Sequence, residues 1–434
     1  MAWCTMKHSL RRTIGAGAAA LIVLAAAAHM AGVAAQDAGK RQKPPAATRA
    51  APPPPPAANG QQQKFPPRAS FTAADEAAAG VPGMPDARFW ADSETDFEKA
   101  LPPQPGPWLI LSTGGSDGAF GAGLLNGLSA AGKRPDYAVV TGVSTGALMA
   151  PFVFAGPRYD ATLQALYTQT SAADIFEVGG TGESFLDTWP LKDLIAKEIT
   201  PALLADIAAA HQAGRRLFIV TTDLDAGRSV VWNMGAIAVH STAHSTNPGG
   251  DAAVKLFRNI LLASGSVPGA FPPVLIDVEG NGKRFAEMHV DGGVAGQFLV
   301  TPPALMQSTS SYKIPADGLY IVVNSSLAPE FQVVERSTPT ILAQAVSTAI
   351  KADLRVLLDR AYVAAKNSGI GFNVATIPPG FNAPNRGAFD PNYMKALFNV
   401  GYDQGKSASP FAAEPPAFPS SPGGMSDPQP GANR

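Results

Sequence analysis

The sequence contains little cysteine and little charge. Of its 434 residues, 1 is a cysteine and 15% are charged, and the formal net charge at pH 7 is −1. The cysteine is Cys4, within a segment with targeting character, so we expect no disulfides, thiol catalysis or cysteine–metal site in the mature protein. A net charge near zero provides no general basic field, so nucleic acid is not an expected partner.

The N-terminus has the pattern of a secretory signal. Basic residues precede a short apolar core at 14–28, and the small residues Val33–Ala35 fit a cleavage site. We therefore expect residues 1–35 to be a signal peptide and the mature protein to be periplasmic or secreted. The alternative is an uncleaved anchor, which would leave the protein membrane-associated, although the apolar run is short for a span.

Proline and glycine divide the rest of the chain. The sequence contains 40 prolines and 43 glycines. Residues 36–100 are predicted to be a Pro/Ala-rich, largely disordered linker, and residues 406–434 a disordered Pro/Gly/Ser-rich tail. Residues 101–405 have mixed apolar patterns, and their length suits one elaborated α/β domain.

Short apolar runs alternate with helical patterns along residues 101–405. The opening reads strand, glycine-rich loop, helix, strand, sharp turn, helix, which favours a parallel sheet with helices on its faces. The expected strands are Trp108–Leu111, Tyr137–Val143, Leu217–Thr222, Ser229–Trp232, a strand ending at Val290, and Leu319–Val323. The expected helices are 119–131, 161–170, 191–199, 202–210, 254–263 and 341–365.

A Gly-x-Ser-x-Gly motif, Gly142–Gly146, lies at the turn between the second strand and its helix. The two glycines leave room for a sharp turn, and Ser144 can then adopt a strained conformation that exposes its hydroxyl at the start of a helix. In a chain so rich in glycine and serine the motif alone is weak evidence. The interpretation of Ser144 as a nucleophile therefore depends on the other loops.

Two more loops follow strands. Gly114–Gly118 follows the first strand, and its N–H groups could converge on an anion at a helix start. This anion could be the oxyanion of an acyl-transfer intermediate or, alternatively, a phosphate. Asp291 precedes Gly292 and Gly293, and it could be the base that a serine nucleophile needs, or part of an ordinary Asp-Gly turn.

Together these loops resemble a known family. Leu109–Leu125 looks like the glycine-rich block of patatin-like phospholipases, and Gly142–Gly146 is similar to their nucleophile elbow. Asp291–Gly293 resembles their Asp-Gly-Gly block, and Ala263–Pro273 the segment before it. The resemblance extends from about Pro107 to Tyr402 and, with the signal, suggests a bacterial, exported member.

The resemblance implies a three-layer α/β/α fold with a mainly parallel central sheet. It implies a catalytic dyad of Ser144 and Asp291, with an oxyanion hole formed by the N–H groups of Gly114, Gly115 and Ser116. It implies neither a metal nor a cofactor in the chemistry. The motif glycines carried over are Gly118, Gly142, Gly146, Gly292 and Gly293.

The sequence departs from the family at Asp117, where many members have Arg or Lys, and at Ser116, which replaces a third glycine. An acidic side chain beside an oxyanion would oppose the developing charge. We therefore interpret Asp117 as the N-cap of the following helix. The departure leaves the preferred lipid headgroup open.

Histidines and other carboxylates suggest alternatives. A Ser-His-Asp esterase or acyltransferase would use His289, although a structural histidine is the simpler reading. His211 would end a helix, where a cation suits the dipole. His240 and His244 lie in a presumed loop and lack an evident third metal ligand. Asp223 and Asp225 are expected in a turn.

The function expected from the sequence is that of an exported serine lipid acyl hydrolase. It would cleave carboxylic esters of phospholipids or related glycerolipids at a membrane surface, through an acyl-enzyme. The expected walls of an acyl groove are Phe120, Phe152, Phe154 and Phe271. The alternative from another class is a non-catalytic envelope-binding protein on the same fold, but the intact serine, aspartate and glycine loop favour activity.

Overall fold

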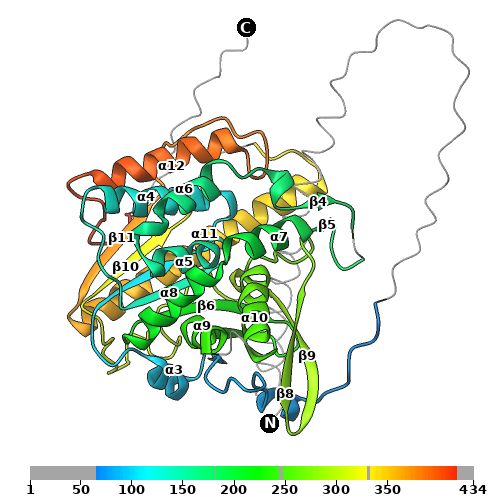
Figure 1. Cartoon of the computed structure of the whole chain (residues 1–434). Coiled ribbons are helices and arrows are strands. Elements are labelled where there is room, and N and C mark those ends of the chain that lie inside the picture. The colour runs from blue at the N-terminus through cyan, green and yellow to red at the C-terminus, as the bar shows by residue number, and fades with distance from the viewer. Residues whose placement is uncertain (1–64, 181, 244–247, 330–332, 418–434) are drawn as a thin grey trace, which may run out of the picture.

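The structure is a computed structural model that describes residues 65–180, 182–243, 248–329 and 333–417 (Figure 1). The predicted signal peptide, the linker before residue 65, His244 and the tail after residue 417 lie outside the described residues. Within the described part, no helix is both long enough and apolar enough to cross a membrane.

A 9-stranded mixed sheet forms the centre of the molecule. Its parallel strands lie in the order β6 (Arg216–Asp223), β3 (Val139–Val143), β2 (Pro107–Leu111), β10 (Gly318–Val323) and β11 (Gly371–Thr376). Strand β7 (Arg228–Asn233) runs antiparallel beside β6, and β1 (Arg88–Trp90) pairs antiparallel with β7 at the edge of the sheet. A hairpin of β8 (Val274–Gly280) and β9 (Lys283–Asp291) joins the sheet through β9, which pairs antiparallel with β6. Figure 1 shows this hairpin projecting from the lower part of the molecule.

Helices cover both faces of the sheet. Side chains alternate along β2, so that Leu109 and Leu111 enter the apolar core on one face and Trp108 and Ile110 the core on the other. The first face carries α4 (Gly118–Ala130), α5 (Thr145–Ala155), α8 (Pro201–Gln212), α9 (Met234–Ala243) and α10 (Pro248–Ser264), with α6 (Asp160–Thr168), α7 (Trp189–Glu198) and α12 (Pro391–Lys406) outside them. The second face carries α3 (Glu94–Ala100) and α11 (Thr338–Ser368). The predicted three-layer α/β/α fold with a mainly parallel sheet is confirmed.

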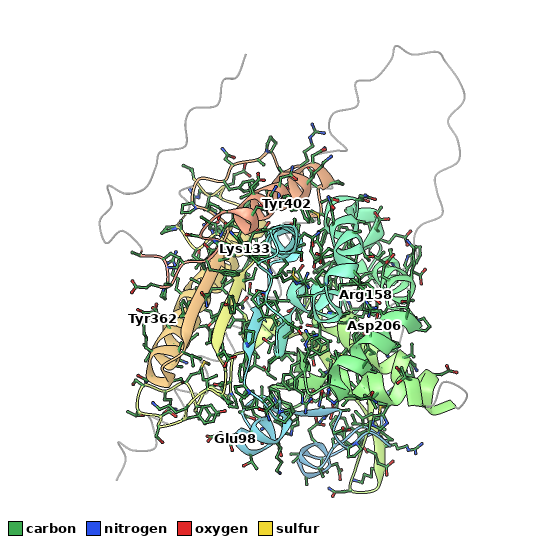
Figure 2. The ribbon with its side chains drawn as sticks, turned by 60° about the vertical axis from the view of Figure 1, so that its left-hand side comes forward. Glu98, Lys133, Arg158, Asp206, Tyr362 and Tyr402 are labelled. Carbon is green, nitrogen blue, oxygen red and sulfur yellow. The ribbon has the colours of Figure 1, made fainter. Side chains whose placement is uncertain are left out.

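Helices α4 and α12 are in close backbone contact. A Cβ atom on Gly123 would lie 2.0 Å from the carbonyl oxygen of Phe398, and one on Gly127 would lie 2.1 Å from that of Tyr402. Just beyond α4, the ammonium of Lys133 (labelled in Figure 2) donates a hydrogen bond of 2.8 Å to the carbonyl of Ser407, the residue after α12. The C-terminal helix is therefore part of the core of the domain.

The prediction of a disordered linker is wrong for residues 65–100. These residues form α2 (Ala73–Ala77), β1 and α3, and β1 pairs with β7 across Phe89 and Val231. Phe89 and Phe97 are buried in the core. The proline-rich composition before residue 65 led to the prediction of disorder for the whole segment. The short elements after it are stabilised by packing against distant strands, which composition does not reveal.

Other elements were not anticipated from the sequence. They are α9, α12, β8, β11, and the two-stranded ribbon of β4 (Glu177–Val178) and β5 (Leu186–Asp187). His240, expected in a loop, lies in α9, where its Nε2 is 3.6 Å from Asp86. Beyond α12, Ala412 bridges to Val374, so the ordered fold extends past the predicted boundary at 405.

Candidate active site

Ser144 occupies a strained turn between β3 and α5. Its φ is 57° and its ψ is −124°, a left-handed φ that among the described non-glycine residues only Asn281 and Phe389 share. The turn requires close backbone approaches, because a Cβ on Gly142 would lie 2.4 Å from the carbonyl oxygen of Gly146. A Cβ on Gly146 would lie equally close, at 2.4 Å, to that of Leu111. The motif glycines therefore hold the conformation that presents the serine hydroxyl.

Strand β9 meets the end of β3 on one edge of β6. Strand β3 pairs with this edge as far as Val143 opposite Val220. From the next residue of β6 onward, β9 takes over, with Asp291 opposite Thr221. Because β3 ends where β9 begins to pair, the residue after Val143 and the last residue of β9 come together.

The hydroxyl of Ser144 donates a hydrogen bond of 2.6 Å to Oδ2 of Asp291. The other carboxylate oxygen, Oδ1, accepts a hydrogen bond of 2.7 Å from the N–H of Gly293, and the N–H of Asp291 donates to the carbonyl of Ser266 at 2.9 Å. Burial raises the pKa of Asp291 to about 6, while the bonds from Ser144 and Gly293 act in the opposite direction. A carboxylate in this position can accept the proton of the serine.

Two serines that the sequence analysis gave no role hold the pair in place. The Oγ of Ser264 accepts a hydrogen bond of 3.0 Å from the N–H of Ser144 and donates one of 2.8 Å to the carbonyl of Val220. The backbone carbonyl of Ser266 accepts the hydrogen bond from the N–H of Asp291. Both belong to the segment Ala263–Pro273, whose likeness to the family was the signal that could have identified them.

The glycine-rich loop lies against the serine turn. Gly114 precedes a 3-10 turn, Gly115–Asp117, and Gly115 has a φ of +56°, which favours glycine. Among the described residues, the N–H groups of Gly114, Gly115 and Ser116 have no hydrogen-bond partner. Gly118 packs directly on the residue after Ser144, because a Cβ there would lie 2.2 Å from Oγ1 of Thr145.

Asn324 fixes this loop to the end of β10. Its Oδ1 accepts a hydrogen bond of 3.1 Å from the N–H of Gly121, and its Nδ2 donates one of 3.0 Å to the carbonyl of Ser112. The backbone N–H of Asn324 also donates to Oγ of Ser112 at 2.9 Å. The asparagine is fully buried, and sequence reasoning gave no indication of its role.

Asp117 occupies the N-cap position of α4, as predicted, but its side chain does not cap the helix. No capping hydrogen bond from its side chain to α4 is present. Instead, Oδ1 of Asp117 accepts a hydrogen bond of 2.8 Å from the hydroxyl of Tyr393 on α12. The acidic side chain therefore points to the C-terminal helix.

The histidines give no support to a Ser-His-Asp triad. His289 is fully buried, with Nδ1 2.9 Å from Oγ1 of Thr221 and Nε2 3.0 Å from Glu287, so both ring nitrogens are engaged away from the dyad. His211 lies in the last turn of α8, but burial lowers its pKa to about 4, so it is not the cation expected there.

Asp223 and Asp225 form a turn, as expected. The N–H of Asp225 donates a hydrogen bond of 2.9 Å to Oδ1 of Asp223 at the end of β6. Asp225 also pairs with Arg68.

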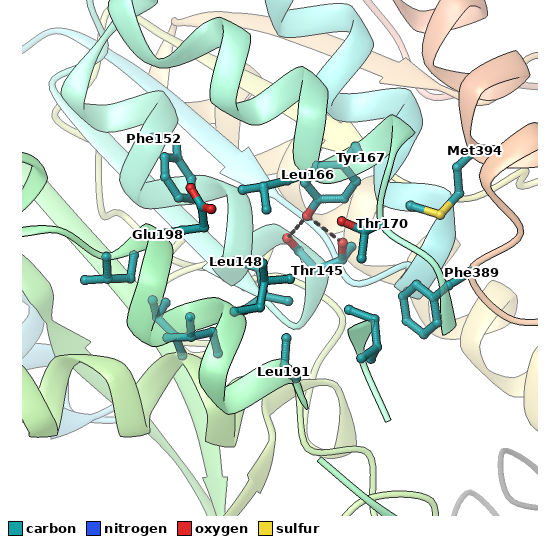
Figure 3. Close-up of a pocket in the computed structure, with 16 residues that line it drawn as sticks. Thr145, Leu148, Phe152, Leu166, Tyr167, Thr170, Leu191, Glu198, Phe389 and Met394 are labelled. Atoms are coloured by element: carbon teal, nitrogen blue, oxygen red, sulfur yellow. Dashed lines mark hydrogen bonds between the residues drawn. The ribbon is translucent and has the colours of Figure 1, made fainter. Parts of the chain in front are cut away.

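An apolar pocket opens beside the loop and the serine turn (Figure 3). Gly115 and Thr145 line it at the site, and the hydroxyl of Tyr167 lies 2.8 Å from Oγ1 of Thr145. Of the four phenylalanines expected as walls, Phe152 alone lines this pocket, and Phe120, Phe154 and Phe271 are buried in the core. The remaining wall is mainly aliphatic: Leu148, Leu166, Ile175, Leu191, Leu194, Ile195, Ile199 and Leu261, closed by Phe389 and Met394.

The site combines a serine on a strained turn, a buried carboxylate, three N–H groups without a hydrogen-bond partner among the described residues, and a neighbouring apolar pocket. Residues 109–304 match the family model described as patatin-like phospholipase. This part of the chain, which carries both Ser144 and Asp291, is therefore similar to patatin-like phospholipases.

The chain has little similarity to individual known proteins. No curated protein matches the chain. Among solved structures, VipD from Legionella pneumophila is similar at 12% identity and a TM-score of 0.35, over 70% of this chain and 66% of that one. The type III effector protein ExoU is similar at 14% identity and a TM-score of 0.20, over 70% of this chain and 54% of that one. The chain spans less than two thirds of the length of either, and neither likeness bears on its function.

Proposed function

We propose that the protein is a serine lipid acyl hydrolase that cleaves carboxylic esters of phospholipids or related glycerolipids through an acyl-serine intermediate. The observation that carries the proposal is the hydrogen bond of 2.6 Å from Ser144 to Asp291, next to an apolar pocket whose lining includes Thr145, the residue after the serine. The resemblance of three separate loops to one hydrolase family supports it as well.

The reaction follows from the positions of these groups. The oxygen of Ser144 attacks the ester carbonyl carbon, and its proton passes to Oδ2 of Asp291. The N–H groups of Gly114, Gly115 and Ser116 stabilise the negative charge on the carbonyl oxygen. When the intermediate collapses, the alcohol leaves with the proton from Asp291.

Water completes the cycle. A water molecule gives a proton to Asp291 and attacks the acyl-serine, and the second intermediate releases the fatty acid and restores the proton on Ser144. An alcohol in place of water would transfer the acyl group instead of hydrolysing it.

The pocket favours a long acyl chain as the part of the substrate bound next to Ser144. Its lining is mainly aliphatic and aromatic, and each methylene buried there contributes about 0.8 kcal/mol. Thr145, Tyr167, Thr170 and Glu198 are its polar members. With the signal-like N-terminus, this supports an exported enzyme that takes its substrate from a membrane surface.

A serine-reactive fluorophosphonate probe tests the dyad. We expect the wild type to be labelled, Ser144→Ala to lose labelling completely, and Asp291→Asn to be labelled at least about 10³-fold more slowly. Ser308→Ala, an exposed serine, is the matched control and should label like the wild type.

Turnover of phospholipid and diacylglycerol esters is the second readout. Release of fatty acid that disappears in Ser144→Ala supports the proposal. Labelling without turnover of any acyl ester would favour a non-catalytic binding protein. Loss of labelling in His289→Ala equal to that in Asp291→Asn, with the variant still folded, would favour a triad.

A further inference from the structure

A second cluster of chemically active side chains lies on the strands that carry the dyad. Asp223 at the end of β6 and Glu287 and His289 on β9 are fully buried. One potential ligand atom from each lies within 4.8 Å of the others. The cluster is separate from the dyad, because neither nitrogen of His289 contacts Ser144 or Asp291.

Several oxygens of this cluster have no hydrogen-bond partner among the described residues. They are Oδ2 of Asp223, Oε1 of Glu287 and both carboxylate oxygens of Glu76. Glu76, on α2, is 6% exposed and interacts with Asp223 and Glu287. A buried carboxylate oxygen without a partner costs several kcal/mol, so these oxygens need a positive ligand or protons.

The charges around the cluster do not balance. Its carboxylates are Glu76, Asp223 and Glu287, and the cation in contact with them is Arg88 on β1, which pairs with Glu287. Arg68, which also faces the cluster, is paired with Asp225. When all three are ionised, the carboxylates exceed the guanidinium by two negative charges.

We propose that Asp223, Glu287 and His289, with Glu76 as a fourth ligand, bind a divalent transition-metal cation. Such a cation balances the excess charge and supplies the missing partners. One imidazole nitrogen with carboxylate oxygens is a donor set for Zn²⁺ or Mn²⁺, whereas Ca²⁺ and Mg²⁺ prefer oxygen alone.

The surroundings of His289 fit this role. Its Nδ1 faces Oγ1 of Thr221 at 2.9 Å, and that oxygen also accepts a hydrogen bond of 2.7 Å from the indole of Trp232. Metal-binding histidines are commonly oriented by such a hydrogen bond on the second nitrogen. Nε2, which faces Glu287, is then the nitrogen available to the cation.

The cation joins three parts of the chain: α2, the end of β6 and strand β9. Asp291 is two residues beyond His289 on the same strand, so the site anchors the strand that carries the proposed base. The cation takes no part in acyl transfer, and the inference does not depend on the proposed function.

Metal content and thermal stability of the full chain, made without a histidine tag, test the proposal. The protein is treated with a chelator, dialysed, and titrated separately with ZnCl₂ and MnCl₂. We expect one of the two to bind at one equivalent per chain and to raise Tm by about 5 °C at a thousandfold excess over its Kd. Failure of both cations to bind or to change Tm would overturn the proposal.

Variants locate the site. Asp223→Asn and Glu287→Gln should each lose stoichiometric binding and the rise in Tm, whereas Asp277→Asn, an exposed carboxylate on the same hairpin, should retain both. Where a variant fails to fold, the wild-type titration still decides. Binding that survives in both Asp223→Asn and Glu287→Gln would place the cation elsewhere and refute the site.

The competing explanation is a shared proton, since burial raises the pKa of Glu76 to about 9. Glu76→Gln separates the two, because glutamine reproduces a protonated carboxyl. With a cation, this variant should bind it at least about tenfold more weakly, the lower end of the loss typical for a perturbed metal site. With a shared proton instead, Glu76→Gln would match the wild type in Tm, and neither protein would respond to either cation.

Discussion

At the scale of single residues, the Asp291 carboxyl controls the expected pH dependence of the reaction. It must be ionised to accept the proton of Ser144, and burial raises its pKa to about 6. We therefore expect kcat/KM to fall tenfold per pH unit below about pH 6, and to be flat above it. Initial rates with a soluble ester between pH 4.5 and 9 measure this. An acid limb near pH 4 would show that Asp291 is not the titrating group.

The same carboxyl should make the site destabilising at neutral pH. Its pKa in the folded protein, about 6, lies above its ordinary value of 3.8, so its contribution to stability is present below pH 4 and is lost as pH rises through 6. The loss is about 3 kcal/mol. Asp291→Asn should therefore be more stable than the wild type at pH 8 while being inactive.

Denaturant unfolding at pH 4 and pH 8 measures the difference in stability between Asp291→Asn and the wild type. The advantage of Asp291→Asn over the wild type should appear at pH 8 and shrink at pH 4. Asp277→Asn serves as the control, since its carboxyl is exposed. A variant less stable than the wild type at pH 8 would mean that the lost hydrogen bonds outweigh the buried charge.

Ser264 is expected to act through the position of the nucleophile. Removing its hydroxyl leaves the N–H of Ser144 and the carbonyl of Val220 unpaired, which costs about 1–3 kcal/mol of stability. We expect Ser264→Ala to lower kcat about tenfold with little change in KM. Ser266→Ala is the matched control, because that hydroxyl donates only to Leu262. Equal effects of both variants on kcat would contradict the assignment.

The sequence singled out the residues proposed to react but not the residues that position them. Ser144, Asp291 and the Gly114–Gly118 loop lie in short motifs whose spacing reflects local backbone geometry. Ser264 is 120 residues from Ser144, and Tyr393 is 276 residues from Asp117. Such contacts depend on the assembled fold, and no local pattern encodes them.

At the scale of elements, the close packing of α4 on α12 makes glycine necessary at the contact. A Cβ on Gly123 would lie 2.0 Å from a backbone carbonyl of α12, which cannot move independently of its helix. Gly123→Ala should therefore destabilise the domain by about 1–3 kcal/mol, through separation of the helices. Gly80→Ala, where a Cβ meets nothing within 4 Å, is the control.

The Asp117–Tyr393 hydrogen bond connects this helix pair to the glycine-rich loop after β2. Separation of α4 from α12 should therefore disturb the site as well as the stability. Melting temperature and kcat of Gly123→Ala, measured together, decide this. A loss of stability with unchanged kcat would show that the loop holds its shape independently of α12.

Elements were predicted where the pattern is long or strongly apolar, and missed where tertiary pairing decides. Strands β2, β3, β6 and β10 are continuous apolar runs, and their positions agree with the sequence within a few residues. Strand β1 has three residues and depends on β7. Helix α9 begins directly after β7, and its polar last turn, His240–Thr242, resembles a loop in the sequence. Their stability lies in contacts that sequence periodicity does not contain.

At the scale of the whole molecule, the site is assembled from segments spread over the chain. The pocket beside Ser144 takes side chains from α5, α6, α7, α10 and α12, and Gly115 from the loop after β2 (Figure 3). The sheet brings Ser144 and Asp291 together, while the helices on one face of the sheet form the apolar pocket beside them. In the proposed enzyme, the chemistry and the choice of acyl chain would therefore be determined by different parts of the fold.

This separation predicts that pocket size can be changed without loss of the chemistry. Leu194→Trp on α7 would fill part of the pocket at a distance in sequence from both catalytic residues. Excluding about four methylenes of an acyl chain costs about 3 kcal/mol, or roughly 100-fold in kcat/KM. We expect this loss for p-nitrophenyl palmitate and at most about a twofold change for p-nitrophenyl acetate.

Val363→Trp on the outer surface of α11 is the matched control, since Val363 is exposed and far from this pocket's lining. Labelling of Leu194→Trp by a small fluorophosphonate should remain at the wild-type rate, which separates a blocked pocket from a damaged dyad. Equal losses for the short and the long ester would mean that the substitution distorts the Ser144 turn. An unchanged kcat/KM for both esters would mean that the acyl chain lies outside this pocket.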